Sequence, residues 1–178
     1  MRTLSGSGVK VDLPQGWDGR IYLRFNEAQS QPAQPPAGPP GAQLSPPAPG
    51  HSTVEEPKPD GHRALHVANF PLPADPGDFG SGAVERMGTG DILVVLLEYH
   101  PDSAKTALFA NQGLPTPLRA SDFSPNAMPK VIPGLAGGQW FFSMAGRAFC
   151  LFVVLGSHAD RARLAPVASS VVQTISLS

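Results

Sequence analysis

Apolar residues form two runs on either side of a short glycine-containing turn, within residues 139–156. Runs rich in aromatic and β-branched residues that flank such a turn, here residues 145–147, predict a β-hairpin. The second run, residues 149–155, is apolar at every position. Because alternate side chains of a strand point to opposite sides, this arm needs an apolar layer on each face. It is therefore expected in the middle of a sheet that is covered on both sides.

Two further segments have the composition of buried strands. Residues 91–99 are almost continuously apolar, so we expect them to lie beside the arm 149–155 in the sheet. Residues 64–70 form a shorter run that ends before Pro71 and Pro73, and proline is a poor residue for a central strand. The sequence thus predicts a core of adjacent strands formed by these segments.

The N-terminal part of the chain alternates apolar and polar positions. Val9, Val11 and Leu13 alternate with polar residues in the segment 8–14, which predicts a half-buried strand. Residues 20–24 alternate again, with Ile21 and Leu23 expected to point inward. A polar outward row keeps water on one face and indicates a strand near a sheet edge. That outward row consists of Arg20, Tyr22 and Arg24.

Three segments have helical character. Residues 80–88 predict a short helix, and residues 101–109 a helix of about two turns. Residues 160–177 offer a broad apolar face at helical spacing. Pro166 either kinks this last helix or marks its first turn, and we favour the second reading, a helix over residues 166–175.

These elements predict an α+β fold. Strands that are apolar on both faces require cover on both sides of the sheet, which the predicted helices provide. The connections between strands are mostly too short for parallel crossovers, so we expect a largely antiparallel sheet. The expected architecture is a three-layer α/β/α sandwich.

Residues 27–62 differ from the rest of the chain. The segment is rich in proline and contains no Phe, Trp or Tyr, so it has little to bury against the entropy cost of ordering. We predict a Pro-rich disordered insertion here, within a single domain made of residues 1–26 and 63–178. Its P-x-x-P spacings match the type of segment that aromatic grooves bind, although low-complexity sequence produces such matches by chance.

Charge and cysteine content narrow the classes of function. The net charge is −1 and the pI about 6.5, so no basic field attracts nucleic acid. No run approaches the ~20 apolar residues of a membrane helix, and no signal region follows the start, which predicts a soluble, cytoplasmic product without membrane insertion. The single cysteine, Cys150, excludes an internal disulfide and is expected to be buried.

The plan of the chain resembles the Mog1/PsbP-like family. The resemblance rests on the opening segment 8–17, with its strand, Leu13-Pro14 and Gly16-Trp17, on the apolar central strands and on the closing amphipathic helix. It implies an antiparallel sheet between helices and a non-catalytic role, as in an extrinsic photosystem subunit, a partner of a nuclear-transport GTPase and bacterial envelope proteins. These roles share no residue motif that carries over to this sequence.

Candidate functional residues are few. Arg and Tyr are enriched in protein interfaces, so Arg20, Tyr22 and Arg24 form a possible contact surface for a protein partner of unknown identity. An alternative is a metal-dependent or hydrolytic enzyme that uses His66, Glu98 and His100. A third reading is a structural subunit of a larger assembly or a homo-oligomer. The leading prediction is a non-catalytic binding or scaffold domain with no cofactor and no metal.

Overall fold

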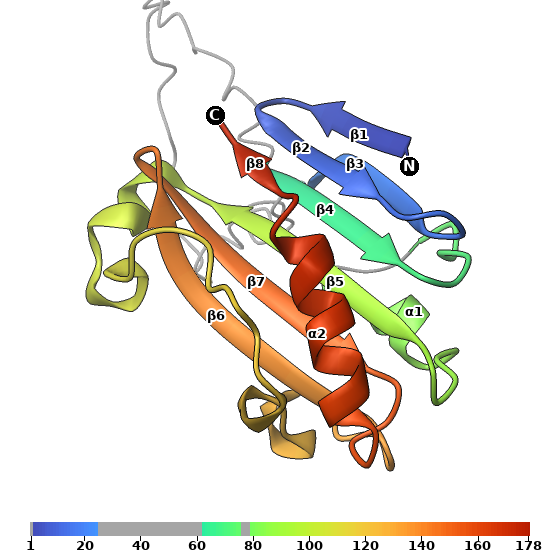
Figure 1. Ribbon diagram of the computed structural model, residues 1–178. Coiled ribbons are helices and arrows are strands. Elements are labelled where there is room, and N and C mark those ends of the chain that lie inside the picture. Colours follow the sequence, from blue (N-terminus) through green and yellow to red (C-terminus); the bar gives the residue numbers. More distant parts are fainter. Residues whose placement is uncertain (1, 25–61, 76–78) are drawn as a thin grey trace, which may run out of the picture.

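The computed structural model describes residues 2–24, 62–75 and 79–178, and the fold is α+β with antiparallel sheets (Figure 1). The larger sheet has five strands in the order β3-β4-β5-β7-β6, and every neighbouring pair is antiparallel. These strands are β3 (Asp18–Arg24), β4 (His62–Ala68), β5 (Ile92–Tyr99), β6 (Ala136–Met144) and β7 (Arg147–Leu155). The predicted antiparallel sheet is confirmed, as is the position of β3 at an edge.

The hairpin β6–β7 is built as the sequence predicts. Ala145 and Gly146 form the two-residue turn with φ angles of 54° and 74°, a conformation that matches the twist of the flanking strands. The all-apolar arm β7 pairs with β5 along its whole length, as expected. Cys150 on β7 is fully buried, which confirms its predicted position.

A second, three-stranded sheet has the order β1-β2-β8 and was only partly predicted. The segment β2 (Val9–Leu13) corresponds to the expected N-terminal strand. The strands β1 (Arg2–Gly6) and β8 (Ser176–Leu177) were missed. The reason is that β1 is largely exposed and carries one large apolar residue, while β8 has only two residues, so neither produces a hydrophobic alternation.

The long helix α2 (Arg161–Val172) begins five residues before Pro166, so the predicted start at Pro166 is wrong. Leu164 and Ala165 in its first turns are buried against the sheet, and this packing stabilises the turns that precede the proline. The ring of Pro166 itself points to solvent, where a missing amide bond costs least. The helix ends at Val172 because the chain then turns into β8.

The remaining helical segments are short. α1 (Ser81–Val84) has a single turn, and Pro101–Lys105 and Ala107–Phe109 are two separate 3₁₀ turns instead of the predicted two-turn helix. Thr106 between them is extended, with ψ of 155°, which interrupts the helical path. Two more 3₁₀ turns, Ala120–Asp122 and Pro125–Ala127, lie in the loop that precedes β6.

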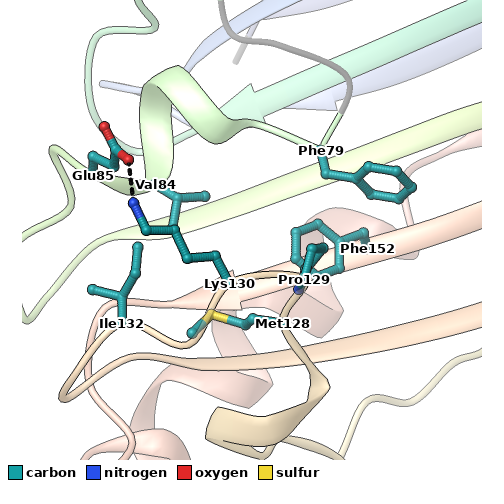
Figure 2. A pocket seen from close by; sticks show the side chains of 8 residues that line it. All are labelled: Phe79, Val84, Glu85, Met128, Pro129, Lys130, Ile132 and Phe152. Atoms are coloured by element: carbon teal, nitrogen blue, oxygen red, sulfur yellow. Dashed lines mark hydrogen bonds and ion pairs between the residues drawn. The ribbon is translucent and has the colours of Figure 1, made fainter.

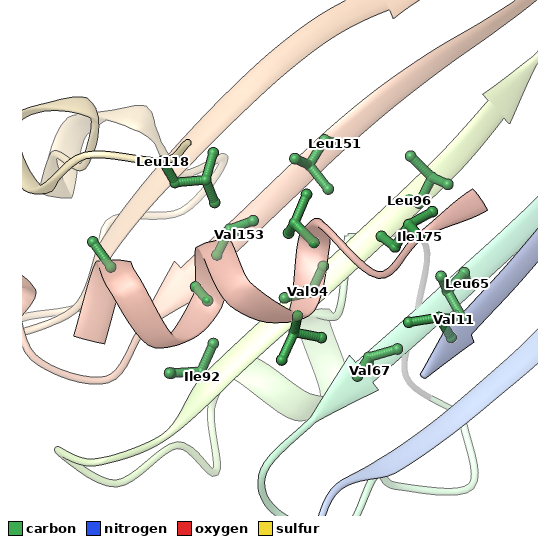
Figure 3. Packing of buried hydrophobic residues seen from close by; sticks show 14 of the residues in the cluster. Val11, Leu65, Val67, Ile92, Val94, Leu96, Leu118, Leu151, Val153 and Ile175 are labelled. Carbon is green, nitrogen blue, oxygen red and sulfur yellow. The ribbon is translucent and has the colours of Figure 1, made fainter. Parts of the chain in front are cut away.

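The five-stranded sheet separates two apolar layers. One layer lies between the sheet, α2 and the three-stranded sheet, and Figure 3 shows how Leu65 of β4, Val94 of β5 and Leu151 of β7 meet α2 and Val11 of β2 there. The other layer is covered by α1 and by loops. Leu23 lies on the same face as Ile21 but is 52% exposed, so its predicted inward position is wrong.

Residues 27–61 of the predicted insertion lie outside the described residues, while His62 begins β4. Within the described ranges, no helix is both long and apolar enough to span a membrane.

Candidate functional site

An apolar pocket opens on the face of the large sheet that carries α1. Phe152 of β7 forms its floor, Phe79 and Val84 border it on the α1 side, and Met128 and Ile132 border it on the loop that leads to β6 (Figure 2). The rings of Phe79 and Phe152 meet edge to face, with 5.7 Å between centroids. Three segments that are distant in sequence thus contribute one aromatic-lined hollow.

Two glycines allow these segments to approach the sheet closely. Gly80, with φ of 70°, precedes α1, and a Cβ there would collide with Leu93 of β5. Gly137 of β6 lies directly beneath Met128, at a place where a Cβ would come within 2.6 Å of the Met128 Cγ. A side chain at either position would displace Leu93 or Met128, so the two glycines allow α1 and the Met128 loop to pack closely on the strands at the borders of the pocket.

The rim of the pocket is polar and its interior is not. Lys130 Nζ donates to Glu85 Oε1 at 3.0 Å across the rim, and both side chains are more than half exposed (Figure 2). The remaining lining residues are apolar. The cavity volume is about 70 Å³, whereas pockets for drug-sized ligands hold roughly 300 Å³ or more. Its size and lining suit one aliphatic side chain, and the lining contains no Ser, Thr, Cys or His.

The predicted contact row on β3 is largely engaged within the molecule. The guanidinium of Arg20 donates to the main-chain carbonyls of Leu72 and Pro73 at 3.2 and 3.1 Å. The hydroxyl of Tyr22 lies 3.0 Å from His66 Nε2, and the two rings meet edge to face. The side chain of Arg24 lies outside the described part of the chain. Arg20 and Tyr22 therefore fix the edge strand to its neighbours.

The three residues of the alternative enzyme site are not brought together. His66 pairs with Val95 in the register and lies, fully buried, on the face of the sheet that carries α1. Glu98 shares the opposite face with Val94 and Leu96. His100 follows the end of β5, where its ring lies 6.1 Å from that of His62. In the described ranges, no three His, Cys, Asp or Glu side chains are grouped to hold a metal ion.

Glu98 belongs to a partly buried ionic cluster instead. Its carboxylate accepts hydrogen bonds from Arg147 Nε at 2.8 Å and from Arg63 Nη1 at 3.1 Å. Arg147 Nη1 also donates to the main-chain oxygen of Ser178 at 2.7 Å, which ties β7 to the chain after β8. Burial raises the pKa of Glu98, but the two arginines outweigh burial and hold that pKa below its usual value. This cluster links β4, β5 and β7, and the cavity beside Arg63 and Glu98 has a volume of about 0 Å³, too small for a ligand.

The pocket residues were missed at the level of the sequence. Met128 and Ile132 lie in a proline-rich loop and Phe79 beside a turn, so none of them takes part in a periodic pattern. A signal was present, because large apolar residues in a loop of turn-forming residues need a surface to cover.

No protein-family model, curated protein or solved structure matches the chain.

Proposed function

We propose that this protein is a non-catalytic binding domain that acts through contact with another protein. The observation that carries the proposal is the open apolar pocket formed by Phe79, Val84, Met128, Ile132 and Phe152. Binding energy in protein interfaces is concentrated where an apolar anchor fills a desolvated pocket. A pocket of about 70 Å³ fits a leucine-sized anchor better than a free metabolite.

The rim supplies the second part of the argument. Glu85 and Lys130 are exposed charges of opposite sign at one side of the pocket. A polar, solvated rim around an apolar centre is the usual anatomy of a non-obligate protein interface. A partner segment with one aliphatic anchor and adjacent polar groups matches both features.

The same proposal extends to the fold family. A largely antiparallel sheet, with α2 on one face and α1 on the other, agrees with the α/β/α sandwich plan of Mog1/PsbP-like proteins. Non-catalytic partner binding is the role that this resemblance implies. Comparing the strand order β3-β4-β5-β7-β6 with that of family members tests this part separately.

The experiment compares three forms of the full chain as bait in lysate of the native host. Ile132→Asp places a carboxylate in the pocket, and Val167→Asp serves as the matched control, because Val167 is 43% exposed on α2 over the opposite face. We expect a partner that wild type and Val167→Asp both retain and that Ile132→Asp loses by tenfold or more, about 1.4 kcal/mol. Equal recovery by all three forms would contradict the proposal.

A further inference from the structure

The outer edge of β6 contains main-chain groups that pair with no other strand in the described part of the chain. Alternate residues of an edge strand point their N–H and C=O groups away from the neighbouring strand. Gly137 and Ser143 show this outward direction directly. Gly137 exchanges two main-chain bonds with Ser124 at 2.9 and 3.0 Å, and Ser143 bonds Asn111 and Gly113 at 2.8 and 2.9 Å.

The outward groups between these two positions have no such partner. Gln139 and Phe141 have the same parity along β6 as Gly137 and Ser143, so their N–H and C=O groups also point outward. None of the hydrogen bonds among the described residues joins these groups to another main-chain group. The edge is therefore closed at both ends and open in the middle.

The segment that could have covered the gap is held elsewhere. Between Gly113 and Ser124 the chain runs in front of β6 beside α2 (Figure 1). The amide of Leu118 donates to Ser169 Oγ of α2 at 2.9 Å, and the Leu118 side chain is buried. Phe123 packs edge to face on Trp140, with 5.8 Å between centroids. These contacts draw the segment onto the α2 face and leave the lateral edge of β6 exposed.

We propose that the open edge of β6 binds a short extended segment of another polypeptide, which adds to the sheet as a sixth strand. Two N–H and two C=O groups at alternate positions are what an added strand pairs with. The interval from Gly137 to Ser143 spans roughly 20 Å, which limits the added strand to about three to five residues. The proposal deepens the protein-contact function and rests on it, since it names an extended peptide as the partner.

The surroundings define the sequence that fits. In antiparallel pairing, the partner residues opposite Gln139 and Phe141 direct their side chains to the α1 face, and the residue between them points to the α2 face. That middle residue meets Trp140, which is partly buried beside Phe123. An apolar or aromatic middle residue is therefore favoured. The β6 edge of a second copy fits less well, because its own Asn111–Gly113 and Ser124 segments would meet those of the first.

The test uses the full chain and a library of random hexapeptides displayed on phage. Peptides selected by the wild type are then added to ¹⁵N-labelled protein. We expect an apolar middle residue in the selected peptides, together with shifted and more slowly exchanging amides at Gln139 and Phe141. Failure to select any peptide, or selection of peptides that leave both amides unchanged, overturns the proposal. Light scattering that finds a dimer with these amides already protected would assign the edge to a second copy and also overturn it.

A pair of variants separates main-chain pairing from side-chain contact. Gln139→Pro removes one outward N–H and leaves the bonds to β7 intact, because the amide of Gln139 does not face β7. Gln139→Thr changes the side chain and retains the amide. We expect at least tenfold weaker peptide binding for Gln139→Pro and little change for Gln139→Thr. Equal affinities overturn the proposal, and a misfolded Gln139→Pro leaves the wild-type amide measurement as the deciding one.

The two proposals fail in distinguishable ways. If Ile132→Asp loses the lysate partner and no peptide binds at β6, the protein-contact function is supported and the edge of β6 takes no part in it. If peptides bind at β6 and the lysate partner binds Ile132→Asp as well as wild type, the edge remains a proposed binding site and the pocket does not.

Discussion

The two faces of the five-stranded sheet are covered in different ways. On one face, α2 and the three-stranded sheet bury a continuous layer that includes Leu151, Val153 and Leu164, all less than 2% exposed. On the other, the single turn α1 and proline-rich loops cover the strands, and Phe79 and Ile132 remain partly exposed around a pocket. The strand residues Leu93, Val95 and Leu97 are fully buried on this face too, so its incomplete cover is confined to the pocket. We therefore expect the first face to contribute most of the stability, while the second contains the pocket that we propose for partner binding.

The largest difference in stability between the two faces is expected when an aromatic side chain is truncated to alanine. Phe149 is fully buried on the α2 face, stacks on Phe142 at 5.6 Å between centroids and lies beneath the guanidinium of Arg147. Phe149→Ala should lower the free energy of unfolding by about 4 kcal/mol through lost burial and a residual cavity. Phe79→Ala on the pocket face should cost about 1 kcal/mol, because that ring is partly exposed.

Urea unfolding followed by circular dichroism measures both variants. Linear extrapolation requires that the slope with denaturant stay that of the wild type. Equal losses of unfolding free energy for Phe149→Ala and Phe79→Ala would contradict the comparison, because the pocket face would then contribute as much to stability as the α2 face.

A smaller contrast is expected between the two ion pairs. Glu98 is 10% exposed and bonds two arginines, so Glu98→Gln leaves two partly buried guanidinium groups without their counterion and should cost about 2 kcal/mol. Glu85 at the pocket rim is 59% exposed, and Glu85→Gln should cost less than about 0.5 kcal/mol. Thermal unfolding of both variants at low and high salt measures how much each ion pair contributes to stability. A salt-sensitive Glu98 contribution and a larger loss at Glu85 would reverse the assignment.

The α2 face follows from the sequence more closely than the pocket face does. The period-two alternation of Val9, Val11 and Leu13 and the unbroken apolar runs of β5 and β7 specify which strands are buried. Glu98 is the one charged residue within β5, yet its partner Arg147 is the first residue of another strand, β7. Strand order, and hence this pairing, is a tertiary property that local patterns do not encode.

The positions of the pocket and of the open edge of β6 could not be predicted from the sequence for a different reason. Met128, Ile132 and Phe79 come from loops without periodicity, and loop paths depend on where each side chain finds an unfilled surface. Among the described residues, the outward main-chain groups of Gln139 and Phe141 lack a main-chain partner because the segment 113–123 is anchored on the α2 face through Leu118 and Phe123. The helix α2 illustrates the opposite error, since a local rule about Pro166 was overridden by the packing of Leu164.

The smallest expected effect is on the pH dependence of stability, measured in a way that separates Glu98 from the other carboxylates. The arginines hold the pKa of Glu98 below its ordinary value of 4.5, so its contribution to stability is complete above that pH and is lost as the pH falls through the folded-state pKa. The difference in unfolding free energy between wild type and Glu98→Gln should therefore shrink from about pH 5 to about pH 3. Lys105 lowers the pKa of Asp102 as well, but Asp102 is unchanged in both proteins and cancels from the difference. Urea titrations at each pH measure it, and a difference that stays constant or grows on acidification would mean that the arginines do not bind the ionised carboxylate.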